Sequence, residues 1–394
     1  MSPAQASQLA LGAGTALCGL SALVWMGLSL PAVAGSRSVR GLGSVTPLAD
    51  DTLPTLTIVS ASRDEAARAE HAARSLLAQD YPGAEIIFVD DRSTDGTGAI
   101  LDRLAAEDPR MRVIHVEALP PGWLGKCHAL ATAAEAARGE WFLFTDGDVW
   151  MTPDAVRRAV TLARELGADH LAVGADLELH TLGERIFSTY FSAIFYASQR
   201  PWKAPDPRSK AHIGIGAFNL VRHDVYRRSG GHGALRMEVL DDLGLGLVVK
   251  RAGGRSHFAN NDRLMGVRWH HGVRGLILGV EKNAFAAMRY RVAETVISVG
   301  VQFACSIMPA IGLFLPGALP KLLALVAWLG IWLLYREIRR GIRVRWWDFL
   351  TAPFGGALFA YAILRSMVVT LRRGGIVWRG TKYEVGDLKH GMVR

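Results

Sequence analysis

The stretch IIFVDDRSTDGT, residues 86–97, decides the fold class of this chain. Apolar residues end at two aspartates and give way to Ser, Thr, Asp and Gly, a pattern typical of a strand, a turn and the start of a helix. The pattern recurs in WFLFTDGDV, residues 141–149. Because open α/β sheets bind ligands outside the carboxyl ends of their strands, both acidic groups are expected at a ligand site.

Working outward, strand-like and helix-like segments alternate. Strands are predicted at 56–60, 85–89, 113–116 and 141–145, with helices ending near 77, following 97, and covering 126–137. This order predicts an α/β domain, a mostly parallel sheet with helices on both faces. A polar linker is expected at residues 41–53, before the first strand.

A third acidic pair, Asp241-Asp242, stands in MEVLDDLGLGLVVK, residues 237–250. Carboxylates gathered at one sheet edge repel one another unless a cation or a proton lies among them. Hard cations such as Mg²⁺ prefer oxygen ligands. The sequence therefore predicts a site for a divalent metal and a phosphorylated ligand, with one acid left over as a base. The turn 93–97 has two open interpretations, a plain helix N-cap cluster or an anion-binding helix N-terminus.

Apolar segments flank this region. The uncharged run from Leu9 to Ala34 is long enough to cross a bilayer, as are 296–315 and 319–335, while 349–371 is a weaker candidate. Ala32-Val33-Ala34 resembles a signal-peptide cleavage site, but no Lys or Arg precedes the run, which favours an uncleaved anchor. The net charge of +9 reflects arginines beside these segments, which fits a membrane surface better than nucleic acid. Three cysteines give neither a disulfide framework nor zinc spacing.

The arginine distribution places the middle of the chain in the cytoplasm by the positive-inside rule. We expect a membrane anchor at 1–40, a catalytic domain at 41–290, and a C-terminal transmembrane or interfacial region at 291–394 that carries a WRGTKY tail. The protein is predicted to cross the bacterial inner membrane several times, with its catalytic domain in the cytoplasm.

Six motifs occur in the order found in family-2 glycosyltransferases of GT-A fold, a Rossmann-like α/β fold. They are VSASRDE (59–65), SLLAQDYPGAEIIFVDDRSTDGT (75–97), GWLGKCHAL (122–130), TDGDV (145–149), GIGAFNLVRHDVYRRSGGH (214–232) and VLDDLGLGLVVKRAG (239–253). The resemblance covers roughly residues 54–290. The flanking apolar segments and the tail IVWRGTKY (376–383) are similar to the lipid-directed branch, which includes ceramide glucosyltransferases and bacterial hopanoid- and carotenoid-associated glycosyltransferases.

The resemblance implies roles for individual residues. A nucleotide-sugar, expected to be a UDP-sugar, would meet Asp91 and Asp90 at its uridine, with Asp64 near the same nucleoside. Asp146 would face the ribose or the metal, and Asp148 would ligate Mg²⁺ or Mn²⁺. The remaining matches are Lys126 near the diphosphate and Asp242 as general base.

Two positions depart from the family pattern. Asp241 stands where the family usually has Glu. The aspartate keeps the negative charge of the glutamate, but its side chain is shorter. The (Q/R)-x-x-R-W motif appears only in part, because Met265 cannot supply the polar contact of its first position. Arg268 could still meet phosphate, and Trp269 could still form a wall. His232 is a further candidate for contact with donor or acceptor.

These expectations describe a membrane-bound inverting glycosyltransferase acting on a hydroxyl of a membrane lipid such as a sphingolipid, hopanoid or carotenoid. Polyprenyl-phosphate and polysaccharide-type glycosyltransferases are alternatives within the class. Sugar-phosphate nucleotidyl transfer is a second enzyme class, but its glycine-rich phosphate loop is absent after the first strand, where VSASRDE stands. A degenerate lipid-binding scaffold is the non-enzyme alternative, and the three intact acidic groups argue against it.

Overall fold

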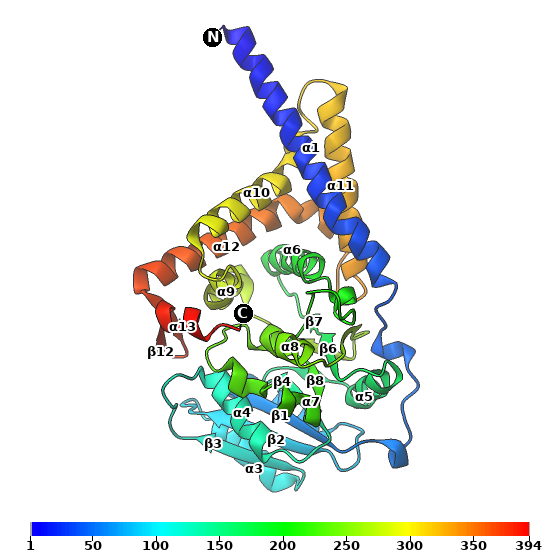
Figure 1. The fold of residues 1–394 in the computed structure, drawn as a ribbon, viewed down its shortest axis with the longest axis vertical. Coiled ribbons are helices and arrows are strands. Elements are labelled where there is room, and N and C mark those ends of the chain that lie inside the picture. Colours follow the sequence, from blue (N-terminus) through cyan, green and yellow to red (C-terminus); the bar gives the residue numbers. More distant parts are fainter. Residues whose placement is uncertain (1, 394) are drawn as a thin grey trace. The chain divides into compact units, whose positions relative to one another are not determined.

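A computed structural model describes residues 2–393 of the chain (Figure 1). The chain divides into two compact units. The helical unit comprises Met1–Arg37, Leu179–Arg200 and Trp269–Ile376, and the sheet unit comprises Ser38–Glu178, Pro201–Arg268 and Val377–Arg394.

The sheet unit is built on seven strands in the order β3-β2-β1-β4-β8-β6-β9. Their bounds are β1 Leu56–Ser62, β2 Glu85–Asp91, β3 Met111–Val116, β4 Trp141–Asp146, β6 His170–Gly174, β8 Asn219–Arg222 and β9 Ser256–Asn260. Only β8 runs antiparallel to its neighbours, so the predicted mostly parallel sheet is confirmed. Strand β2 extends through both acids of its motif and β4 through the first acid of its own, so Asp90, Asp91 and Asp146 belong to strands rather than to the turns that follow.

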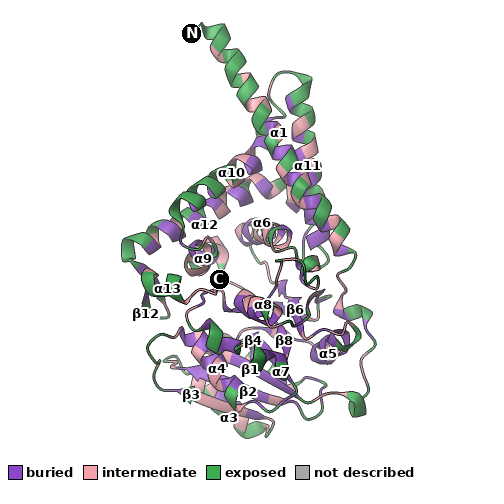
Figure 2. Cartoon of the chain, viewed as in Figure 1, coloured by how far each residue is buried: buried purple, intermediate pink, exposed green. Residues whose placement is uncertain are grey.

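Helices cover both faces of this sheet, as side-chain alternation along the strands requires. In β2, Ile86 and Phe88 face a core formed with α2 (Ala66–Leu77), α3 (Thr97–Glu107) and α5 (Ala155–Glu165). Ile87 and Val89 face the opposite core, formed with α4 (Gly125–Ala136), α7 (His223–Arg228) and α8 (Asp241–Arg251). Each fully buried side chain of this size contributes about 1.5–3 kcal/mol. Figure 2 shows the middle of this sheet coloured as buried, while β3 at its edge is mostly of intermediate burial.

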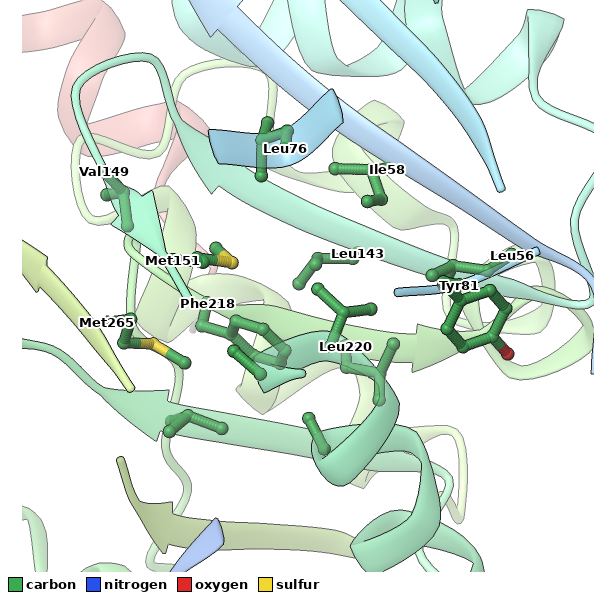
Figure 3. Close-up of a cluster of buried hydrophobic side chains, with 14 of the residues drawn as sticks. Leu56, Ile58, Leu76, Tyr81, Leu143, Val149, Met151, Phe218, Leu220 and Met265 are labelled. Atoms are coloured by element: carbon green, nitrogen blue, oxygen red, sulfur yellow. The ribbon is translucent and has the colours of Figure 1, made fainter. Parts of the chain in front are cut away.

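A second, three-stranded sheet explains one departure from the family pattern. It has the order β5-β10-β7, with β5 Trp150–Met151, β7 Asp176–Leu177 and β10 Met265–Val267. The Met265 side chain is fully buried in the core beside Met151 and Phe218 (Figure 3). Its apolar character therefore suits its packing.

The linker expected at 41–53 is largely exposed, but two of its side chains anchor it in the core. Leu42 and Val45 are buried in the main core, and the segment contains two short 3₁₀ helices, Leu42–Ser44 and Asp50–Thr52. Composition alone pointed to a polar linker because charged and small residues surround these two side chains.

The helical unit contains α1 (Pro3–Ser36), α6 (Leu182–Gln199), α9 (Gly272–Ala287), α10 (Val292–Ile311), α11 (Ala318–Ile338) and α12 (Ala352–Arg373). Within it, α1 packs against α11, and α12 against α10, α9 and α6 (Figure 1). The Trp25 indole donates to the Cys305 carbonyl over 2.9 Å, which ties α1 to α10. Among the residues that the structure describes, four helical segments are long and apolar enough to cross a membrane: Pro3–Ser36, Val292–Ile311, Ala318–Ile338 and Asp348–Arg373. The run 349–371, the weaker candidate by sequence, is one of them.

After α12 the chain forms the hairpin β11 (Gly375–Trp378) and β12 (Thr381–Glu384), followed by α13 (Val385–Gly391). We call residues 377–393 the C-terminal strap. It packs on the rest of the sheet unit, because Leu388 is fully buried and the Val393 amide donates to Glu238 Oε2 over 3.0 Å.

Candidate functional site

The strand register brings the first two acidic groups to one edge of the sheet. Ser62 of β1 lies opposite Asp90 of β2, and Ala61 lies opposite Asp146 of β4. The three neighbouring strands therefore end together, as strands that bind a ligand at their carboxyl ends do. The Ser62 hydroxyl is buried beside Gly147, the middle residue of the Asp-Gly-Asp motif.

Lys126 joins the second and third acidic groups. Its Nζ lies 2.7 Å from Asp146 Oδ1 and 3.2 Å from Asp241 Oδ2. Burial opposes the charge on this ammonium, but the carboxylates of Asp146, Asp241 and Asp242 hold the pKa of Lys126 well above its usual value. Lys126 is therefore a fixed cation among the acids, at the first turn of α4.

Gly216 makes a second link between these groups. Its amide donates to Asp242 Oδ2 over 3.0 Å, and its carbonyl accepts from the Asp146 amide over 3.1 Å. A Cβ at this position would lie 2.6 Å from Asp146 Oδ2. The backbone at Gly214 lies against α8, because a Cβ there would lie 1.7 Å from the Asp242 carbonyl oxygen. Glycines in GIG (214–216) thus allow this loop to lie directly against the start of α8.

Asp242 is held in place and resists ionisation. The Leu243 amide donates to Asp242 Oδ1 over 2.8 Å, in addition to the bond from Gly216. Burial and the neighbouring charge of Asp241 raise the pKa of Asp242 to about 6, although Lys126 acts in the opposite direction. A carboxylate with a raised pKa near neutrality has the properties of a general base.

Asp148 lies in a poorly solvated position with one basic partner. Its Oδ2 accepts from Arg68 Nη1 over 3.1 Å. Burial and the negative charges of Asp146 and Glu65 raise the pKa of Asp148 to about 7, against the opposite effect of Arg68. The same Arg68 nitrogen donates to the Arg268 carbonyl over 2.9 Å. Sequence reasoning missed Arg68, which lies 80 residues from Asp148 along the chain.

Asp90 and Asp91 point to opposite faces of the sheet. Asp91 lies on the α4 side, where Arg92 Nε donates to its Oδ1 over 2.7 Å and a Cβ at Gly125 would lie 2.4 Å from its Oδ2. Asp90 lies on the α3 side, where its Oδ2 is 3.1 Å from His115 Nδ1. Asp91 is thus grouped with α4, which begins at Gly125 and carries Lys126, and Asp90 is not. The two-residue period of a strand was a signal for this separation.

Asp64 connects the turns after β1 and β2. Its backbone is in the left-handed region, with φ 53°, and its Oδ1 accepts from the Thr94 amide over 2.8 Å. Asp95 caps the neighbouring helix starts by accepting from the Thr97 and Ala66 amides, over 3.1 and 2.9 Å. The capping interpretation of the turn 93–97 therefore accounts for Asp95.

The C-terminal strap contributes two residues near this end of the site. Arg379 pairs with Glu65, and its Nη1 lies 3.5 Å from the Asp64 carbonyl oxygen. Arg379 and Gly380 both have positive φ, 48° and 79°, as a two-residue hairpin turn of type I′ requires. Burial raises the pKa of Tyr383, and the neighbouring backbone of Gly125 acts in the opposite direction. The tail motif was visible in the sequence, but its place beside Asp64 and Gly125 was not.

The remaining predicted residues lie elsewhere. His232 is buried behind the site, bonded through Nδ1 to the Tyr226 hydroxyl at 2.9 Å, and burial lowers the pKa of His232 to about 3. It is therefore a neutral core residue. Trp269 belongs to the helical unit, where its ring lies 4.9 Å from that of Phe191.

The donor set fits a divalent cation that brings further ligands with it. Among residues 2–393, no three His, Cys, Asp or Glu side chains are gathered as a metal site. Asp146 and Asp148 offer hard carboxylate oxygens, which suits Mg²⁺ or Mn²⁺. Mg²⁺ commonly takes one or two carboxylates from the protein and completes its shell with substrate phosphates and water.

Comparison with known proteins gives a family match for part of the chain. Residues 57–230 match the model described as glycosyl transferase family 2. A succinoglycan biosynthesis protein of Rhizobium meliloti is 35% identical over 32% of this chain and 34% of its own length. A beta-monoglucosyldiacylglycerol synthase of Synechocystis sp. is 30% identical over 35% of this chain and 31% of its own. The chain thus spans about a third of the length of these relatives.

A solved structure shares the fold. The mannosyltransferase PcManGT from Pyrobaculum calidifontis, in complex with GDP-Man and Mn²⁺, superposes with a TM-score of 0.58 at 18% identity. The alignment covers 90% of this chain and 98% of that one. The GT-A fold expected from the sequence is confirmed.

Proposed function

The chain carries a family 2 glycosyltransferase domain at residues 57–230, and on this premise we propose that it is a membrane-bound inverting glycosyltransferase. It moves a sugar from a UDP-sugar to a hydroxyl of a membrane lipid. The observation that carries the proposal is the meeting of Asp146, Asp241 and Asp242 around Lys126 and Gly216. This arrangement supplies a fixed cation and a high-pKa carboxylate within one cluster.

The nucleotide end of the donor is assigned to Asp91 and Asp64, at the ends of β2 and β1. Asp146 faces the ribose or the metal, and Asp148 is the metal ligand. A divalent ion bound there would neutralise charge on the diphosphate as it leaves, which often lowers the barrier by several kcal/mol. Lys126 adds a preorganised positive charge beside Asp146. Arg268 is assigned to phosphate and Trp269 to a wall of the acceptor site.

Asp242 is assigned as the general base. The acceptor hydroxyl must lose a proton as it attacks the anomeric carbon, and a positioned carboxylate contributes roughly 10²–10⁴-fold to such a step. The bonds from Gly216 and Leu243 hold both Asp242 oxygens in one orientation. A single in-line attack inverts the anomeric centre, so an α-linked UDP-hexose gives a β-glycoside. An NMR coupling constant showing an α-glycoside product would contradict this assignment.

Two lines support a lipid acceptor. Four helical segments are apolar and long enough to span a membrane, and one relative is named as a synthase of a glucosylated diacylglycerol. The proposed location is a bacterial inner membrane, crossed several times, with the catalytic domain in the cytoplasm. The domain division 1–40, 41–290 and 291–394 belongs to the same proposal.

A polysaccharide-type activity is the second candidate, because another relative is named for succinoglycan biosynthesis. Product size separates the two: a lipid acceptor gives discrete glycolipids, whereas a polysaccharide activity gives polymer. A polyprenyl phosphate acceptor is already ionised, so an Asp242→Asn variant would keep full turnover.

The donor class is tested by nucleotide competition. Purified full-length protein is titrated with UDP and with GDP in the presence of Mn²⁺, and binding is measured by calorimetry. We expect UDP to bind at least about 10-fold more tightly, a difference of about 1.4 kcal/mol. Preference for GDP would overturn the UDP-sugar assignment while leaving the glycosyltransferase domain intact.

A further inference from the structure

Both carboxylates of the Asp-Gly-Asp motif already have basic partners within the chain. Lys126 pairs with Asp146 at 2.7 Å, and Arg68 pairs with Asp148 at 3.1 Å. The two pairs come from different helices, α4 and α2, that flank the ends of the strands. Each carboxylate of the motif to which a metal is assigned therefore already faces a cation before any ligand arrives.

We propose that Arg68 is a tethered counter-ion of Asp148, which a divalent cation displaces only when it arrives together with the nucleotide diphosphate. This inference rests on the proposed function and adds an order of binding and a residue to it. Arg68 acts through Asp148 and is a positioning residue.

Burial explains why Asp148 needs a counter-ion. Its side chain is 19% exposed and that of Arg68 is 26% exposed, so water screens the pair only in part. A carboxylate left without a partner in such a position is costly, and it takes up either a proton or a cation. Arg68 fills that need in the ligand-free protein.

Loss of the Arg68 partner explains why the metal and the nucleotide would arrive together. A free divalent ion at Asp148 would displace the guanidinium of Arg68 from its carboxylate. A nucleotide-sugar diphosphate brings phosphate oxygens that can pair with that guanidinium in its place. The exchange of partners therefore favours the metal together with the diphosphate over the metal alone.

The geometry also gives Arg68 a place to remain. The nitrogen that contacts Asp148 donates to the Arg268 carbonyl as well, at 2.9 Å, and this bond is independent of Asp148. A guanidinium freed from a carboxylate can bond phosphate oxygens, for which its planar fork is well suited. Arg68 would thus exchange a carboxylate for the diphosphate without leaving the site.

The test measures Mn²⁺ binding to full-length protein by electron paramagnetic resonance, with and without UDP. The measurement is made at about pH 8, where free carboxylates are ionised and Mn²⁺ stays in solution. The variants are Arg68→Met, Arg68→Gln and, as a matched control on the same helix, Arg74→Met. Arg74 is half-exposed and pairs with Glu70 and Glu107 on the surface.

We expect wild type and Arg74→Met to bind free Mn²⁺ weakly, with UDP tightening the binding at least about 10-fold. Arg68→Met is expected to bind free Mn²⁺ at least about 10-fold more tightly than wild type, so that UDP adds less. Arg68→Gln, which keeps a donor for the Arg268 carbonyl, is expected to behave likewise if Arg68→Met does not fold.

Three results would overturn the inference. In the first, both Arg68 variants bind free Mn²⁺ no more tightly than wild type does. Arg68 would then have only a structural role, joining α2 to the Arg268 carbonyl. Another is equally tight Mn²⁺ binding by wild type with and without UDP. A third is no Mn²⁺ binding to any protein even with UDP, and only this last result also removes the metal from the proposed function.

Discussion

Lys126 Nζ lies 2.7 Å from Asp146 Oδ1, and this contact joins the end of β4 to the first turn of α4. The same ammonium reaches Asp241 at the start of α8. One cation therefore joins α4 to β4, the next element along the chain, and to the more distant α8, and its removal has consequences for both stability and activity.

Replacing Lys126 by Met leaves neighbouring carboxylates without their cation. Because the Lys126 side chain is 22% exposed, we expect the free energy of unfolding to fall by roughly 1–3 kcal/mol, less than for a fully buried pair. Donor turnover is expected to fall by at least about 100-fold through lost charge stabilisation. Urea unfolding and kinetics check the two effects. Lys382→Met, which removes a half-exposed pair with Glu384, is the control, and equal losses in both variants would refute the role of Lys126.

The raised pKa of Asp242 predicts an acidic limb in the pH–rate profile. Below its pKa of about 6 the carboxyl is protonated and cannot accept a proton, so kcat is expected to fall about tenfold per pH unit and to level off above pH 7. The free energy of unfolding changes with pH in the opposite direction to kcat. The folded protein holds this proton more tightly than the unfolded chain, so ionisation of Asp242 destabilises the fold as pH rises from about 4 to about 6. A flat kcat between pH 5 and 7 would contradict the general-base role.

Replacing Gly216 by Ala is expected to lower activity while the protein still folds. An added Cβ would lie 2.6 Å from Asp146 Oδ2, the end of a side chain, so Gly216→Ala displaces Asp146 with little cost to the core. We expect kcat/KM to fall by roughly 10–100-fold, because small misplacements of reacting groups are costly. Gly233→Ala is the matched control, since nothing lies within 4 Å of its Cβ. Unchanged kinetics in Gly216→Ala would show that this close approach has no role.

Much of this site follows from sequence, and the rest depends on long-range contacts. The apolar strand followed by acids was enough to place Asp91 and Asp146 at one sheet edge, since parallel neighbours end together. Arg68 and Arg379 gave no such signal, because their partners are 80 and 314 residues away and an arginine on a helix or in a turn is usually a surface residue. Leu42 was missed for the same reason, as its burial depends on tertiary packing rather than local pattern.

A substitution in the C-terminal strap is expected to weaken donor binding. Arg379 contacts Glu65 and the Asp64 carbonyl, so Arg379→Ala is expected to loosen the turn that carries Asp64. The pair is partly exposed, so we expect less than about 1 kcal/mol in stability. The KM for donor should rise about 3–10-fold with kcat little changed, the pattern of lost uniform binding. Arg228→Ala, which breaks an exposed pair with Asp224, is the control, and an unchanged donor KM would contradict the prediction.

The most direct measurement is transfer to lipid. Membranes containing wild type or Asp242→Asn protein are incubated with labelled UDP-sugars and Mn²⁺ or Mg²⁺, and the extracted lipids are identified by mass spectrometry. We expect a discrete glycolipid to form with one UDP-sugar and to be lost when EDTA is added. The rate of its formation is expected to fall at least about 100-fold in the variant. Label found only in polymer, or a lipid product formed equally well by Asp242→Asn, would contradict it.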